Sequence, residues 1–227
     1  MPLSWTEVVQ RDSVYLNLGG GTDCHPRPNY ENYVAVDLEP RGEFAVAQDL
    51  SKTIPLPDQS VNRILSEHFL EHIDEQAIVT VLRESHRLLK PGSVARIAVP
   101  DYGHPRARHC LALGRDPRRR DHITLTTYPL IKALIAASPF RIARFHHYWD
   151  GDRFVDEPID YSLGYIRRTP DNDPNNHSRG FRRKLGRLVR DIGEYVRHGT
   201  GTTAMHLETR RYHRLAVTSL VVDLWRE

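Results

Sequence analysis

Apolar residues recur along the first half of the chain in short runs, separated by residues that favour turns. Five runs are rich in β-branched and aliphatic residues and have the length of buried strands: residues 14–18, 33–37, 43–48, 61–67 and 93–99. Between the last two runs, apolar positions form a helical stripe over residues 75–89, with Asp74 as a good N-cap. Strands that alternate with a helix in this way predict an α/β fold with a doubly wound sheet.

The second half of the chain has a looser pattern. We expect helices over 106–113 and 127–138, a sixth strand over 140–149 and a last strand over 214–225. The polar residues 150–178 predict an irregular loop. Over residues 180–198, apolar side chains recur at i, i+4 and i+7, which predicts an amphipathic helix with a basic polar face. We treat residues 1–227 as a single domain.

A glycine turn directly follows the first predicted strand. Gly19, Gly20 and Gly21 suit a backbone that takes positive φ or lets a ligand approach the chain closely. The second strand ends at Asp37, and an acid in this position holds the ribose hydroxyls in nucleotide-binding sheets. The linker between them contains two prolines, so a regular helix N-terminus for a pyrophosphate is not expected there. The pattern therefore favours a nucleoside cofactor without a phosphate.

These residues resemble a known family. The segment LNLGGGTD, residues 16–23, is similar to the cofactor loop of class I S-adenosylmethionine (SAM) methyltransferases, with Asn17 where an acid is common and Asp23 where a third glycine is common. Three further segments extend the resemblance to residue 101: QDL at 48–50, SEHFLEH at 66–72, and LLKPG at 88–92 followed by a strand.

The resemblance implies SAM as the cofactor and a Rossmann-like sheet of seven strands, mostly parallel with an antiparallel last strand. Asp37 would hold the ribose, and Asp49 would accept the adenine amino group while Leu50 supports the ring. The full set of cofactor-binding residues that it implies is Asn17, Gly19, Gly20, Gly21, Asp37, Leu38, Asp49, Leu50, Ser66 and Glu67.

A narrower resemblance concerns the second half. The segments DHIT at 121–124 and YWD at 148–150, with the closing TSLVVD at 218–223, are similar to small bacterial methyltransferases often encoded beside glycosyltransferases. That resemblance implies O-methylation of a saccharide, a glycolipid precursor or a related small molecule. Residues 102–140 and 150–212 would then be elaborations on the substrate side of the domain. The basic helix at 180–198 is an addition to that pattern.

Candidate catalytic residues follow the fourth and fifth strands. His68 lies at the carboxyl end of a strand, where ligands bind in such sheets, and imidazole titrates near neutral pH. We therefore predict His68 as general base, with His72 and His122 as further candidates; alternatively, His68 only shapes the cofactor site by packing and hydrogen bonding. Residues well placed to contact the substrate are Asp101, Tyr102 and Tyr128.

The spacing of His68, Glu71 and His72 also allows a metal site. In a helical turn, residues at i, i+3 and i+4 share one face, and two histidines with one carboxylate bind a transition metal more readily than magnesium. The alternative is that Glu71 and His72 serve structure by capping and packing. We favour the structural roles and predict no metal ligand.

Composition and charge indicate in which cell compartment the protein works and which partners it could bind. The 227 residues are 39% hydrophobic, and no run approaches the roughly 18 apolar residues of a membrane span. Two cysteines give no disulfide framework, which favours the cytoplasm. Arginines cluster at 115–120 and 179–190, although the net charge is only +3.

These observations leave alternatives for partners and function. The arginine clusters are either solvated faces or seats for an anionic group, including a peripheral contact of 180–198 with an anionic membrane. A small-molecule or glycan acceptor is expected and nucleic acid is not, because no nucleic-acid module is visible. The other functions to consider are a non-catalytic SAM-binding protein of the same fold and an RNA methyltransferase.

Overall fold

One sheet organises the molecule. The computed structural model describes residues 2–20, 33–40, 42–105, 107–163 and 219–227. Within these residues eight strands form one sheet in the order β3-β2-β1-β4-β5-β8-β6-β7. Their bounds are β1 Tyr15–Leu18, β2 Tyr33–Asp37, β3 Ala45–Ala47, β4 Val61–Glu67, β5 Leu89–Pro100, β6 Ile142–Asp150, β7 Arg153–Asp156 and β8 Ser219–Trp225.

The strand directions confirm the predicted class of fold. Neighbours among β1 to β5 are parallel, whereas β8 is antiparallel to both β5 and β6, and β7 is antiparallel to β6. The strand order reverses between β1 and β4, because the chain builds β2 and β3 on one side and β5 on the other. In doubly wound sheets this reversal, at the carboxyl ends of the strands, is where ligands bind.

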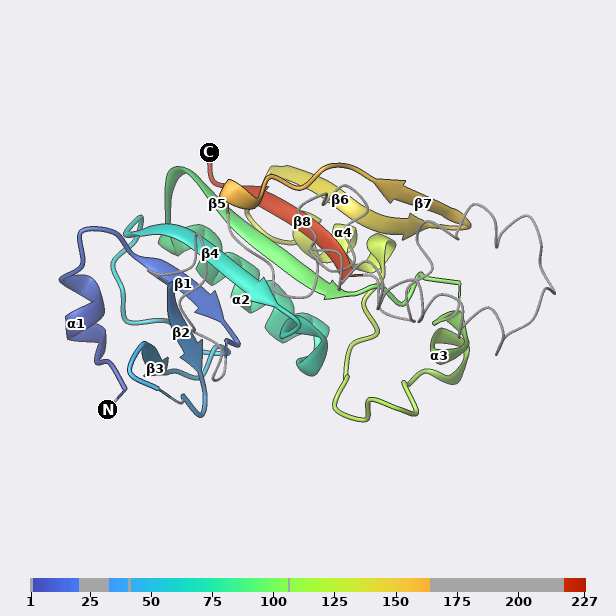
Figure 1. Cartoon of the computed structure of the whole chain (residues 1–227), viewed down its shortest axis with the longest axis horizontal. Coiled ribbons are helices and arrows are strands. Elements are labelled where there is room, and N and C mark those ends of the chain that lie inside the picture. Colours follow the sequence, from blue (N-terminus) through green and yellow to red (C-terminus); the bar gives the residue numbers. More distant parts are fainter. Residues whose placement is uncertain (1, 21–32, 41, 106, 164–218) are drawn as a thin grey trace, which may run out of the picture.

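Three of the four described α-helices, all but α3, begin at a residue whose side chain accepts from a free backbone N–H. The described helices are α1 Trp5–Val9, α2 Glu75–Leu88, α3 Arg108–Leu113 and α4 Tyr128–Ala136, with short 3₁₀ turns η1 Leu70–His72 and η2 Tyr161–Leu163. The Asp74 side chain accepts from the backbone N–H of Ala77 at 2.8 Å, as predicted for the N-cap of α2. In Figure 1, α2 and α4 lie behind the sheet, and α3 lies beyond the carboxyl end of β5.

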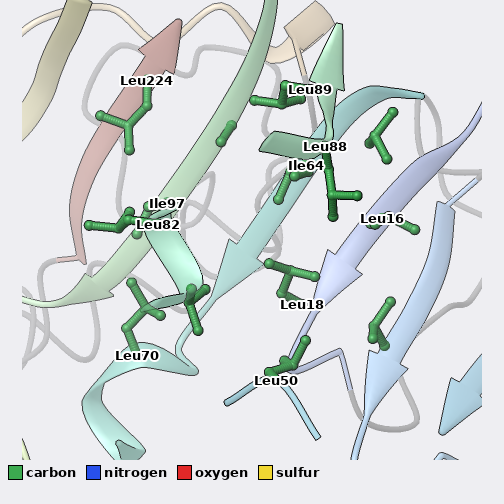
Figure 2. Close-up of a cluster of buried hydrophobic side chains, with 14 of the residues drawn as sticks. Leu16, Leu18, Leu50, Ile64, Leu70, Leu82, Leu88, Leu89, Ile97 and Leu224 are labelled. Atoms are coloured by element: carbon green, nitrogen blue, oxygen red, sulfur yellow. The ribbon is translucent and has the colours of Figure 1, made fainter. Parts of the chain in front are cut away.

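The core lies between the sheet and α2. Ile78, Val81, Leu82 and Leu88 form the buried stripe of α2. They belong to one cluster with side chains of β1, β4, β5 and β8, and Figure 2 shows members from each of these elements. This packing fixes the strands whose ends carry the candidate site. In the described part of the chain, no helix is long and apolar enough to cross a membrane.

Two expectations need correction. The sheet has eight strands rather than seven, because part of the predicted loop at 150–178 forms β7 and η2. Gly151, with φ of 56°, permits the tight turn that pairs β7 with β6, and Phe154 packs on Trp149. Because the segment is mainly polar, its sequence did not predict β7, a strand of four residues. Strand β5 also begins at Leu89, which pairs with Val61 before a bulge, rather than at 93.

Candidate active site

The glycine turn after β1 leaves no space for side chains. Gly19 has φ of 70°, and its N–H donates to the carbonyl of Val36 at 2.9 Å. A Cβ on Gly19 would lie 2.3 Å from the ring of Phe69, and one on Gly20 would lie 2.4 Å from Nδ2 of Asn17. Glycine is therefore required at both positions. The predicted Gly21, like Asp23, falls outside the described residues.

Two buried polar atoms next to this turn have no hydrogen-bond partner in the described structure. They are Oδ1 of Asn17 on β1 and Oγ of Ser66 on β4. The two strands are neighbours in register, with Leu18 opposite Ser66. A buried polar atom left unpaired costs about 1–3 kcal/mol. The end of β1 and β4 is thus suited to a ligand that brings polar groups.

The acids predicted to bind a nucleoside lie at the same edge of the sheet. Asp37 is half-buried at the end of β2, and its Oδ1 accepts from the N–H of Glu39 at 3.2 Å. Oδ1 of Asp49 accepts from the hydroxyl of Ser51 at 2.6 Å and from its N–H at 3.0 Å, which holds the pKa of Asp49 below its ordinary value. Leu38 is exposed and Leu50 is buried. Their contacts with a cofactor stay predictions.

His68 follows β4 in a left-handed conformation. Its φ is 55°, which is uncommon outside glycine, and its N–H donates to Ala98 of β5 at 2.8 Å. Nε2 lies 2.9 Å from the hydroxyl of Ser219, at the start of β8. Nδ1 lies 3.2 Å from Oε1 of Glu71, a contact without the alignment of a hydrogen bond. Only 4% of the His68 side chain is exposed.

Residue 68 precedes the helical turn, so the condition for a shared helical face of His68, Glu71 and His72 is not met. The 3₁₀ turn η1 starts at Leu70. Instead, Glu71 is completely buried and forms a centre around which three histidines gather. Nε2 of His72 and Nε2 of His122 each lie 4.0 Å from Oε1 of Glu71.

The backbone brings His122 to this place. The carbonyl of Glu71 accepts from the N–H groups of Ile123 and Thr124 at 2.8 and 3.0 Å. These bonds attach the segment between α3 and α4 to η1. Nδ1 of His122 lies 2.6 Å from the hydroxyl of Tyr102, and burial lowers the pKa of His122 below its ordinary value.

The predicted substrate residues have different surroundings. The buried carboxylate of Asp101 accepts from the N–H groups of Trp149 at 2.7 Å and Gly103 at 2.9 Å, and burial raises its pKa to about 7. Tyr102 donates its hydroxyl to Asp116 at 2.7 Å, which places it beside the histidine cluster. Tyr128 instead stacks on Tyr148 at 4.0 Å, between α4 and β6. Contact of each with a substrate stays a prediction.

Sequence reasoning missed Glu71 as the centre of the site, and it missed Ser219 and Asp116. The segment SEHFLEH contained a signal for Glu71, because it places an acid between histidines at short spacing. Ser219 and Asp116 contact His68 and Tyr102 across long sequence separations, and their own neighbourhoods gave no signal.

Comparison with known proteins finds a family match over part of the chain and several similar solved structures. Residues 16–97 match the family model described as a methyltransferase domain. A SAM-dependent methyltransferase from Archaeoglobus fulgidus is similar in structure, with a TM-score of 0.54 and 13% identity, over 98% of this chain and 90% of that one. Phosphoethanolamine N-methyltransferase 2 from Haemonchus contortus, solved with S-adenosylhomocysteine, has a TM-score of 0.51 and 12% identity, over 99% of this chain and 53% of that one. None of the curated proteins matches this sequence.

These findings agree with the architecture. The matched residues run from β1 into β5 and include the glycine turn, both nucleoside-side acids and the His68–Glu71–His72 segment. The overall fold is similar to that of the solved methyltransferase from Archaeoglobus fulgidus. The family match over residues 16–97 and the similar solved structures support a SAM-dependent methyltransferase with SAM as its cofactor.

Proposed function

We propose that this enzyme methylates a hydroxyl oxygen of a saccharide, a glycolipid precursor or a related small molecule. The observation that carries the proposal is the surroundings of His68, which has a buried carboxylate on one ring nitrogen and a hydroxyl on the other. The saccharide class is supported by the similarity of residues 121–124, 148–150 and 218–223 to methyltransferases encoded beside glycosyltransferases.

The residues around the glycine turn suit the cofactor. The unpaired atoms of Asn17 and Ser66 would bind polar groups of SAM, and Gly19 and Gly20 allow its close approach. Asp37 would hold the ribose, with Asp49 and Leu50 at the adenine. When bound, SAM supplies a methyl group on a positively charged sulfonium, which needs an aligned and desolvated nucleophile.

A hydroxyl acceptor needs a base, and His68 has the arrangement of one. The carboxylate of Glu71 near Nδ1 favours the tautomer that carries its proton on that atom. Nε2 would then keep its lone pair and accept from the hydroxyl of Ser219, which lies 2.9 Å away. A substrate hydroxyl in the place of the serine hydroxyl would lose its proton to the same atom. Such a base contributes about 10²–10⁴-fold to the rate.

Replacement of His68 tests this role. We expect His68→Gln to lose about two to four orders of magnitude in turnover with a hydroxyl acceptor, because glutamine keeps a hydrogen bond but accepts no proton. SAM affinity should stay close to that of the wild type. The measurement is release of S-adenosylhomocysteine with a panel of sugars, nucleotide sugars and amines, and SAM binding by calorimetry. The matched control is His109→Gln at an exposed histidine.

Three results would contradict the proposal. Near-full turnover of His68→Gln with a hydroxyl acceptor would show that His68 only positions other groups. Turnover confined to amines, including phosphoethanolamine, would show that the enzyme is an N-methyltransferase. If both His68 variants, Gln and Ala, fail to bind SAM, the residue belongs to the cofactor site.

A further inference from the structure

Three side chains other than that of His68, the predicted base, have possible metal-ligand atoms close to one another. Glu71 comes from η1 together with His72, and His122 comes from the segment between α3 and α4. One ligand atom from each of the three lies within 4.8 Å of the others. The cluster therefore forms only in the folded chain, from residues about 50 positions apart, by the spacing of 71 and 122.

The hydrogen bonds of the two imidazoles decide which nitrogens carry protons. Nδ1 of His72 lies 2.9 Å from the backbone carbonyl of Asp121, which can only accept. The hydroxyl of Tyr102 donates to Asp116, so it accepts from Nδ1 of His122 at 2.6 Å. Both neutral histidines thus carry their proton on Nδ1. Their Nε2 lone pairs are left on the side of Glu71, 4.0 Å from its Oε1.

The carboxylate at the centre has no hydrogen bond of its own. Glu71 is 0% exposed, and neither of its oxygens has a hydrogen-bond partner in the described structure; the same holds for Nε2 of His122, whose side chain is 5% exposed. A buried carboxylate is costly unless a cation compensates it. Oε1 of Glu71 and the two Nε2 atoms each offer a lone pair, and one cation between them would accept all three lone pairs and compensate the charge of the carboxylate.

We propose that Glu71, His72 and His122 bind one divalent first-row transition metal ion. Two atoms bonded to one ion at about 2.0–2.1 Å lie at most about 4.2 Å apart, so the 4.0 Å between Oε1 and each Nε2 is within reach of one ion, and the side chains would close in slightly to give tetrahedral geometry. Two nitrogens and one oxygen favour Zn²⁺, Mn²⁺, Co²⁺ or Fe²⁺ over Mg²⁺, which takes oxygen ligands.

The hydrogen-bond partners of the two histidines are of the kind that metal-binding histidines have. A metal-bound histidine donates its other ring N–H to a carbonyl or similar acceptor, as His72 does to Asp121 and His122 does to Tyr102. The contact of His68 with Oε1 of Glu71 orients the carboxylate from outside. Three protein ligands leave at least one position open, as in catalytic metal sites.

The open position explains how the site would serve the reaction, and this part rests on the proposed hydroxyl acceptor. A substrate hydroxyl bound to the metal would have a lower pKa, because the ion stabilises the alkoxide. His68 lies beside the proposed metal site, because its Nδ1 is 3.2 Å from Oε1 of Glu71, the same atom that lies 4.0 Å from Nε2 of His72. The hydroxyl proton would pass to a neighbouring base, the oxygen would take the methyl group from the sulfonium of SAM, and S-adenosylhomocysteine would leave.

Metal titration of the whole, untagged, metal-free protein tests the site without reference to activity. We expect one equivalent of Zn²⁺ or Co²⁺ by calorimetry, visible d–d absorption from Co²⁺ bound to nitrogen and oxygen, and a rise in the melting temperature. We expect metal binding to weaken by more than about 10-fold in each of the variants Glu71→Gln, His72→Ala and His122→Ala. Loss of a residue that only hydrogen-bonds to a metal ligand already costs about 10–100-fold in metal affinity. His109→Ala, at an exposed histidine, should bind as the wild type does.

The outcomes separate this inference from the proposed function. Absence of metal binding in the wild type, or equal binding in wild type and all three variants, would overturn the site. Because 32% of the His72 side chain is exposed, His72→Ala leaves the core intact even if Glu71→Gln does not fold. His68→Gln should keep the metal and lose turnover. A protein that binds the metal through these residues but methylates only amines would refute the hydroxyl acceptor and leave the site standing.

Discussion

At the scale of single residues, the cofactor side of the site depends on glycine, which has no side chain, at positions 19 and 20. We predict that Gly20→Ala weakens SAM binding, because its Cβ would lie 2.4 Å from Nδ2 of Asn17 and would displace that side chain. Loss of a hydrogen bond that Oδ1 of Asn17 accepts from the charged cofactor would cost about 1.5–3 kcal/mol. Calorimetric titration with SAM measures the change.

The same substitution elsewhere serves as the control. Gly92, unlike Gly20, has a positive φ, of 77°, and a Cβ there meets nothing within 4 Å. Gly92→Ala should therefore lower the stability through backbone strain and leave the SAM affinity unchanged. Equal affinities of wild type and Gly20→Ala would remove Asn17 from the cofactor site.

A second prediction at this scale concerns the pH dependence of stability. Burial raises the pKa of Asp101 to about 7, against an ordinary value of 3.8. The folded state therefore binds a proton that the unfolded state has lost between about pH 4 and 7, so this group's contribution to the free energy of unfolding falls as the pH rises through that window. The slope reaches at most about 1.4 kcal/mol per pH unit.

Comparison with an uncharged variant isolates the effect of Asp101 from that of other groups. Asp101→Asn cannot titrate, and its amide group opposes one of the two backbone N–H donors of Trp149 and Gly103. The variant should be less stable than the wild type at pH 5, and the gap should narrow towards pH 8. Urea denaturation across this range measures both proteins, and a constant gap would mean that Asp101 stays ionised throughout.

At the scale of elements, the sequence predicted those strands and helices that carry their own signal. The strands at 33–37 and 61–67 have the predicted bounds, because continuous apolar runs are buried on both faces of a parallel sheet. Helix α2 differs from the prediction by one residue at its end. Strand β7 was missed, because an edge strand of four residues with polar neighbours has no such run.

The candidate site could be predicted only where it is local in sequence. The glycine turn and Asp37 belong to one strand–turn–strand unit, and His68, Glu71 and His72 belong to one short segment. By contrast, His122 reaches Glu71 through backbone bonds from a separate segment. Its partner atoms could not be read from the chain, since contacts between distant segments depend on the path of the intervening loop. The predicted helix at 180–198 lies outside the described residues.

At the scale of the whole molecule, a buried ionic network joins the two halves of the sheet. Arg96 of β5 is 0% exposed and donates to both oxygens of Asp223 on β8 at 2.7 Å. Nε2 of His146 on β6 lies 3.0 Å from the same carboxylate. Although burial opposes ionisation, the bonds from Arg96 and His146 hold the pKa of Asp223 below its ordinary value. The network also reaches the segment before η2, because Arg96 donates to the carbonyl of Asp160 at 2.7 Å.

We predict that Asp223→Ala lowers the free energy of unfolding by about 3–5 kcal/mol, because it removes the carboxylate that accepts two hydrogen bonds from the buried guanidinium of Arg96. The cost comes from removing one partner of a buried pair and not from the pair as such. The double variant Arg96→Met with Asp223→Leu, which removes both charges and fills the space, should therefore recover most of the loss. Chemical denaturation of the wild type and both variants measures the difference. If the double variant is as unstable as Asp223→Ala, the strands β5, β8 and β6 need the hydrogen bonds themselves to stay in register.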